Sequence, residues 1–148
     1  MSRKRSVRPV EVFISYSSKN LNFAARLVDV LGTYGVRSFL SRRSIRGAQE
    51  WHDEIGAALK RCDWFLVILS PDSVRSKWIR RELTYALRAD RYNDRIIPVL
   101  YKTCDVDELS WALSAQQVDF RRSFDQGCQD LLNIWRLPYR SERTHKPG

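Results

Sequence analysis

One carboxylate in this sequence shares an expected helical stripe with two aromatic side chains. Trp78, Glu82 and Tyr85 stand at i, i+4 and i+7, which places neighbours on one face of a helix. A carboxylate in a dry, partly aromatic environment can stabilise a positive charge that develops in a transition state. The alternative is a solvent-facing glutamate paired with Arg75 or Arg88, because exposed glutamates are common on helices. The pattern alone marks Glu82 as a candidate and leaves both interpretations open.

The elements that must position this carboxylate alternate along the chain. Five short apolar segments are expected to be strands: Glu11–Ser15, Val36–Leu40, Trp64–Leu69, Ile96–Tyr101 and Val118–Phe120. Amphipathic segments follow the first three strands and the last, and residues 102–116 are expected to be irregular, with a helical turn near 109–113. Such alternation predicts an α/β fold, a doubly wound five-stranded parallel sheet of flavodoxin-like order 2-1-3-4-5 with helices on both faces.

This topology predicts where a ligand would bind. In doubly wound sheets the site lies beyond the carboxyl ends of the strands, where the strand order reverses, here between the first and third strands. Three segments are expected to converge there: Ser15–Ser18, Ser41–Glu50 and Ser70–Ser76.

Composition narrows the class of protein. An apolar share of 43% with 29% charged residues is typical of a globular domain. The longest purely apolar run, Trp64–Leu69, is far below the roughly 20 residues of a membrane span, and no signal peptide is recognised. Cys62, Cys104 and Cys128 show no metal-ligand spacing, so we expect reduced thiols, no metal site, no membrane contact and a cytoplasmic location.

The net charge of +9 raises the alternative of a nucleic-acid-binding module. Part of this excess lies in the two ends of the chain, which we assign as a basic N-terminal tail (1–9) and a C-terminal tail (138–148) around a domain at 10–137. No nucleic-acid motif is recognised, so this alternative ranks low. Response-regulator receivers share the fold class, but the first strand lacks the paired acids of their phosphorylation site.

Three segments resemble boxes of the Toll/interleukin-1 receptor (TIR) domain family. Val12–Ser18 resembles the family's opening box, and Ile45–Trp51 is similar to the end of the loop after its second strand. Leu66–Pro71 together with Ser76–Leu83 resembles the third strand and the Ser-x-Trp-x-x-x-Glu-Leu helix. The three boxes occur in order and at suitable spacing between about Glu11 and Leu87.

The resemblance implies one of two functions. Many TIR domains are adaptors that assemble with other TIR domains, whereas others, in bacteria, plants and one animal branch, cleave the nicotinamide–ribose bond of NAD+. This chain resembles the cleaving members of bacterial type. The catalytic glutamate of those enzymes maps onto Glu82. The resemblance therefore favours an NAD+ nucleosidase or ADP-ribosyl cyclase in immune or anti-phage defence signalling, with NAD+ as substrate and no separate cofactor. It also implies self-association upon activation and a downstream effector that senses the product.

The remaining candidates for substrate binding are also carried over from the resemblance. Serine hydroxyls and aromatic rings would contact ribose or base, and arginines of the covering loop would contact the pyrophosphate. They are Ser15, Tyr16, Ser17, Ser18, Ser41, Arg42, Arg43, Arg46, Trp51 and Trp78. The alternative role is helix capping for the serines, ordinary packing for the aromatic residues and a solvated loop for the arginines. An acid that many members carry just after the second strand is replaced here by Ser41 or Arg42, and no glycine-rich dinucleotide motif is present.

Overall fold

The computed structural model describes residues 7–41, 48–105 and 117–140, with side chains described from residue 53 onward in the second of these ranges. Five parallel strands form one sheet: β1 (Glu11–Ser15), β2 (Arg37–Leu40), β3 (Trp64–Leu69), β4 (Ile96–Leu100) and β5 (Val118–Asp119). Their order is β2-β1-β3-β4-β5, which confirms the predicted fold class and strand order.

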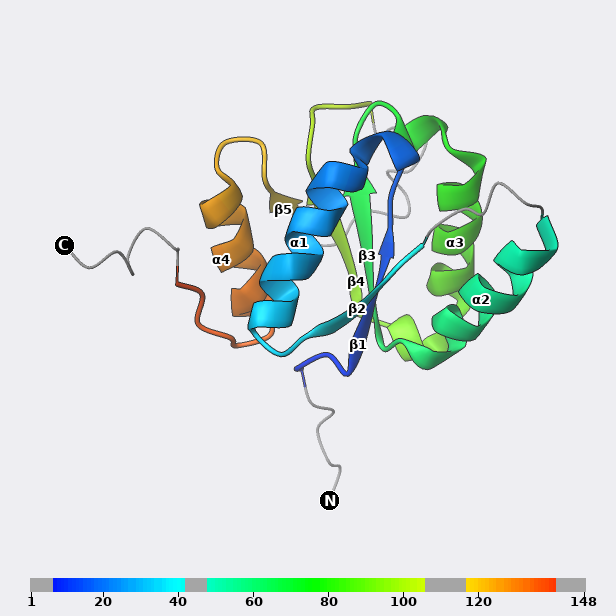
Figure 1. The fold of residues 1–148 in the computed structure, drawn as a ribbon, viewed down its shortest axis with the longest axis horizontal. Coiled ribbons are helices and arrows are strands. Elements are labelled where there is room, and N and C mark those ends of the chain that lie inside the picture. Colours follow the sequence, from blue (N-terminus) through cyan, green and yellow to red (C-terminus); the bar gives the residue numbers. More distant parts are fainter. Residues whose placement is uncertain (1–6, 42–47, 106–116, 141–148) are drawn as a thin grey trace, which may run out of the picture.

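Within the described residues, two pairs of α-helices cover the sheet, one pair on each face (Figure 1). On one face lie α1 (Leu21–Thr33) and α4 (Phe124–Ile134), and on the other lie α2 (Ala48–Arg61) and α3 (Lys77–Arg88). Three short 3₁₀ helices, η1 (Ser18–Asn20), η2 (Ser73–Arg75) and η3 (Asp90–Tyr92), lie in the connections. The sheet therefore separates two apolar cores, as expected for a doubly wound fold.

The central strand contributes to both cores. All six residues of β3 are buried, and they alternate: Leu66 packs toward the α1/α4 face and Phe65 toward the α2/α3 face. Phe65 stacks against Phe13 of β1, with ring centroids 5.3 Å apart. A run of six apolar residues is thus explained by burial on both sides, which is usual for parallel sheets.

The ends of several elements differ from the sequence-based expectation. The helix α3 begins at Lys77, three residues later than expected, because Ser76 caps it: its side chain accepts a hydrogen bond from the backbone amide of Ile79. The strand β5 is one residue shorter than predicted. The turn expected near residues 109–113 lies outside the described residues.

The sequence offers Gly32 or Gly35 as the glycine that ends the first helix, and the structure shows that Gly35 has this role. Its φ of +76° is the left-handed conformation that favours glycine, and it comes two residues after the end of α1. Within the described ranges no helix is both long and apolar enough to cross a bilayer.

Candidate functional site

The candidate carboxylate is buried at the carboxyl ends of two strands. Glu82 on α3 has an exposed fraction of only 2%. The Ser15 hydroxyl, at the end of β1, donates to Glu82 Oε1 across 2.6 Å. The Ser41 hydroxyl, directly after β2, donates to Glu82 Oε2. Because both carboxylate oxygens accept hydrogen bonds from the sheet edge, the solvent-facing interpretation of Glu82 is wrong.

The alternation of β1 decides which neighbouring side chain reaches Glu82. Ser15 points to the α2/α3 face, and the next residue, Tyr16, packs into the opposite core with Phe23 and Ile14. Tyr16 is 6% exposed. Of these two neighbouring candidates, Ser15 bonds to the carboxylate, whereas Tyr16 belongs to the core on the α1/α4 face.

A pocket of about 480 Å³ lies beside this site, between the loops that follow β1 and β3. Its lining residues carry hydroxyl, charged and indole groups: Ser17, Ser18, Lys19, Asp72, Arg75, Ser76, Lys77 and Trp78. The volume is within the range of small-molecule sites. Two of the three segments expected to converge are therefore together here. Of the third, Ser41 is described and lies against Glu82.

Buried hydrogen bonds connect the two loops beneath this pocket. The Ser70 hydroxyl, directly after β3, donates to Asn20 Oδ1 across 2.6 Å, and all of these groups are buried. Ser70 and Ser73 also bond to each other: the Ser70 amide donates to Ser73 Oγ at 2.7 Å, and the Ser73 amide to Ser70 Oγ at 3.1 Å. This network fixes the separation of the loops that form the pocket walls.

Sequence reasoning missed Asn20, Ser70 and Ser73 as supports of the site. The sequence offers Ser17, Ser18 and Asn20 as caps for the first helix, but the Asn20 side chain makes no capping hydrogen bond and accepts from Ser70 instead. Of the three supports, only Ser70 directly follows a strand, and that position was the available signal, since small polar residues there meet at one sheet edge.

The outer rim of the pocket is charged and exposed. Lys19 and Asp72 form an ion pair of 3.8 Å, with side chains 76% and 38% exposed. Such a pair is screened by solvent and holds the two loops only weakly. Rigidity at the pocket therefore comes from the buried hydroxyls and not from the rim.

Trp78 forms part of the pocket wall one helical turn before Glu82. It is half-buried, and the Arg81 guanidinium lies over its ring, 5.5 Å from the centroid. Ser17 caps η1 by accepting from the Lys19 amide at 3.3 Å, whereas Ser18 is exposed. Ser17 thus serves the capping role that was its alternative, and it lines the pocket as well.

The remaining predicted contacts fall outside the described part of the chain. These are Arg42, Arg43 and Arg46, together with the side chain of Trp51 in the first turn of α2. Their assignment as substrate contacts stays a prediction.

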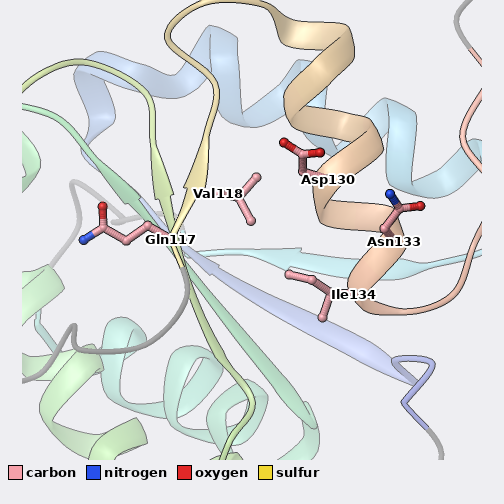
Figure 2. A pocket seen from close by; sticks show the side chains of 5 residues that line it. All are labelled: Gln117, Val118, Asp130, Asn133 and Ile134. Atoms are coloured by element: carbon pink, nitrogen blue, oxygen red, sulfur yellow. The ribbon is translucent and has the colours of Figure 1, made fainter.

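A second pocket of about 460 Å³ lies at the far edge of the sheet, between β5 and α4. Figure 2 shows Val118, Asp130, Asn133 and Ile134 on the α4 side of β5, whereas the Gln117 side chain extends to the other side of the strand. Because β5 and β1 are separated by two strands, this pocket is distinct from the site around Glu82.

A doubly wound parallel sheet with a buried glutamate at its carboxyl end can be compared with known protein families. The family model for the TIR domain matches residues 12–132, and the chain belongs to this family. The prediction made from the three boxes is confirmed.

Known proteins similar to this chain support the same assignment. A protein of Brachypodium distachyon, named a probable 2′ cyclic ADP-D-ribose synthase, is 31% identical over 93 residues, which are 62% of this chain and 40% of that protein. The chain thus spans less than half the length of that relative.

Two solved structures show the same fold. The TIR domain of a Toll-related receptor from Hydra magnipapillata superposes with a TM-score of 0.60 at 20% identity, covering 84% of this chain and 90% of that chain. The TIR domains of the activated Roq1 resistosome, which recognises the pathogen effector XopQ, give a TM-score of 0.60 at 16% identity, covering 83% and 97%.

Proposed function

We propose that this TIR domain cleaves the bond between nicotinamide and ribose in NAD+, with Glu82 as the catalytic carboxylate. The observation that carries the proposal is the position of Glu82: buried, on α3, and in contact with the carboxyl ends of β1 and β2. Family membership and the relative named as a cyclic ADP-ribose synthase support it.

The proposed reaction suits a single carboxylate. When the C1′–N bond breaks, its electron pair goes to the cationic nicotinamide ring, which leaves the ribose as neutral nicotinamide and needs neither an acid nor a metal ion. Positive charge develops on the ribose, as in other glycosidic cleavages. A buried carboxylate stabilises that charge more strongly than one in water, because the local dielectric constant is lower.

Two acceptors can complete the reaction. Water attacking C1′ gives ADP-ribose and a proton, whereas a nucleophile of the same molecule gives a cyclic isomer and a proton. The pocket beside Glu82 would hold the rest of the dinucleotide: Lys19, Arg75 and Lys77 suit the pyrophosphate, and Trp78 suits stacking with a ring.

The proposal extends to the setting of this reaction. We place the enzyme in the cytoplasm, in an immune or anti-phage defence response, where its nucleotide product acts on a downstream effector. Activity would rise upon self-association, so assays belong at high protein concentration.

Incubation of the purified chain with NAD+ tests the proposal, with nicotinamide and the nucleotide products separated by chromatography. Glu82→Gln preserves the shape of the side chain but removes its charge, and is expected to abolish cleavage. Glu54→Gln is the matched control, because Glu54 is an exposed glutamate on α2. Cleavage that continues unchanged in Glu82→Gln would remove Glu82 from the mechanism.

A non-catalytic adaptor is the second candidate, and one observation favours it. Both oxygens of Glu82 already accept hydrogen bonds from serines, so the residue could simply fasten α3 to the sheet in a domain that acts by TIR–TIR association. An absence of turnover in concentrated wild-type protein, together with concentration-dependent self-association by light scattering, would favour this candidate.

A further inference from the structure

The two serines that hold Glu82 differ in how firmly they are built into the sheet. Ser15 is fully buried at the end of β1, between β2 and β3. Ser41 is 6% exposed and follows β2, the edge strand, whose residues are exposed or half-buried. Both donors are therefore buried, but Ser15 ends a central strand and Ser41 follows the edge strand.

This difference sets the cost of releasing each hydroxyl from Glu82. If Ser15 turned away, its hydroxyl would remain buried and lose its partner, which is costly. Ser41 is also buried, but it is slightly more exposed than Ser15 and follows the edge strand, so a ligand that enters at this edge can supply a new partner for its hydroxyl. Its release needs only rotation about χ1, because the Ser41 amide stays bonded to the Ile14 carbonyl at 3.1 Å.

Glu82 in its present state is too enclosed to meet a substrate. Because only 2% of the residue is exposed, a ribose hydroxyl reaches the carboxylate only if a neighbouring group moves, and the two serine hydroxyls are in direct contact with it. The geometry points to Ser41 as the one that moves.

We propose that the Ser41 hydroxyl is a removable cap on Glu82, whose place a substrate ribose hydroxyl takes, while Ser15 stays and orients the carboxylate. This inference rests on the proposed function for the identity of the substrate. The Ser41 hydroxyl keeps Glu82 hydrogen-bonded between turnovers. Displacing it costs free energy, so the substrate binds less tightly than it would to an uncapped carboxylate.

Kinetics of Ser41→Ala and Ser15→Ala on NAD+ test the cap, with Ser38→Ala on the same edge strand as the control. Without the cap, Ser41→Ala is expected to lower KM by about twofold to tenfold, the worth of one net hydrogen bond, and to keep kcat within about twofold. Ser15→Ala is expected to lower kcat. If Ser41→Ala instead loses kcat as Ser15→Ala does, Ser41 is a fixed positioning residue and the proposal is overturned.

An NAD+ analogue that lacks both the 2′- and 3′-hydroxyls on the nicotinamide ribose tests what replaces the cap. Used as a competitive inhibitor, it is expected to bind wild type and Ser41→Ala equally well, since it cannot exploit the released oxygen. A gain for the analogue as large as the gain for NAD+ would overturn the role given to the ribose hydroxyl.

Chemical labelling keeps this test separate from the proposed function. A water-soluble carbodiimide with an amine modifies accessible carboxylates, and mass spectrometry of the peptide containing Glu82 gives the rate. We expect Ser41→Ala to label Glu82 about twofold to tenfold faster than wild type or Ser38→Ala, the same hydrogen-bond factor. An unchanged rate overturns the cap even in an active enzyme. Absence of NAD+ cleavage in wild type overturns the proposed function and leaves the labelling result to decide the cap.

Discussion

Two glutamates are buried at opposite ends of the same parallel sheet, and their partners differ. Glu11 begins β1 at the amino end, is 7% exposed, and accepts two hydrogen bonds from the Arg61 guanidinium at 2.8 and 3.1 Å. Glu82 lies at the carboxyl end and accepts from the hydroxyls of two serines. An arginine fork holds a carboxylate in a fixed geometry through two parallel hydrogen bonds, whereas a hydroxyl rotates freely and can be exchanged. The partners of Glu11 at the amino end therefore have a fixed geometry, whereas the hydroxyl partners of Glu82 at the carboxyl end can be exchanged.

The same contrast extends to the surroundings of the two glutamates. At the amino end, Asp63 accepts from the backbone amides of Val10 and Glu11 and from Arg95. At the carboxyl end, Asn20, Ser70 and Ser73 join loops through neutral groups beside an open pocket. Charged side chains thus make the contacts around Glu11 at the amino end, whereas uncharged polar side chains connect the loops near Glu82 at the carboxyl end.

The largest expected effect separates the two glutamates by activity. Glu82→Gln is expected to reduce NAD+ cleavage by about a thousandfold or more, because a preorganised charge at the reacting centre contributes several kcal/mol. Glu11→Gln is expected to keep the wild-type rate within about twofold at temperatures where it is folded. Comparable losses in the two variants would show that the site is disturbed only through folding.

Next in size is a difference between thiols at the two ends. Burial raises the pKa of Cys62 at the amino end to about 12, whereas Cys104, beyond β4, is half-buried and its pKa is raised by burial to a lesser extent. A thiol-specific reagent at pH 8 is expected to label Cys104 at least tenfold faster than Cys62, because the thiolate reacts and its fraction falls tenfold per pKa unit. Mass spectrometry of the labelled peptides measures both rates. Equal rates in native protein would contradict a closed amino end.

The same pKa shift has a consequence for stability. The unfolded Cys62 thiol ionises near its ordinary pKa of 9.0, below the folded value of about 12. The unfolded state therefore binds fewer protons in this range, so the stabilisation is complete below about pH 9 and is lost as pH rises toward 12. Cys128 is buried with the same shift and adds in the same direction. Urea unfolding at a series of alkaline pH values measures it, with Cys62→Ala as the comparison.

A smaller effect is expected from the buried hydroxyl network of the carboxyl end. Ser70→Ala removes the donor to Asn20 Oδ1 and the acceptor for the Ser73 amide, leaving both groups buried and unsatisfied. We expect a loss of about 1–3 kcal/mol in the free energy of unfolding. Ser38→Ala on the half-exposed edge strand is the control, expected within about 0.5 kcal/mol. Equal midpoints in urea for these two variants would contradict a supporting role for Ser70.

The smallest effect is expected at the ion pair of the amino end. The Arg61 side chain is 51% exposed, so solvent screens its pair with Glu11 and the loss in Arg61→Ala is expected to be about 1 kcal/mol or less. The loss should shrink as salt increases, because exposed charges are screened. A loss that is large and independent of salt would show that the pair acts as a buried one.

Most of the fold followed from local patterns in the sequence. The apolar run at residues 64–69 and the alternation of strands with amphipathic helices predicted the five strands and their order, because burial on two faces leaves a characteristic composition. The boundary of α3 was predicted less well, since Ser76 as the capping residue competes with several other serines nearby.

The site was predicted in part, and the misses have physical reasons. Glu82 was chosen by its helical stripe and its family box, but its burial depends on Ser15 and Ser41, which come from distant strand ends. Because successive side chains of a strand point to opposite faces, Ser15 and Tyr16 could have been assigned to different faces from the sequence. They were grouped because both lie in the first family box. The bond between Asn20 and Ser70 joins residues fifty positions apart, and no local pattern signals such a pairing.

The unbroken apolar strand β3 also constrains how the chain can be made. It pairs with β1 on one side and with β4 on the other, so a nascent chain that ends before Ile96 leaves one edge of its most apolar segment open. An open apolar edge is a template for aggregation. Synthesis must therefore proceed past Leu100 before the segment is safely enclosed, and premature stops between β3 and β4 should yield insoluble products rather than smaller working domains.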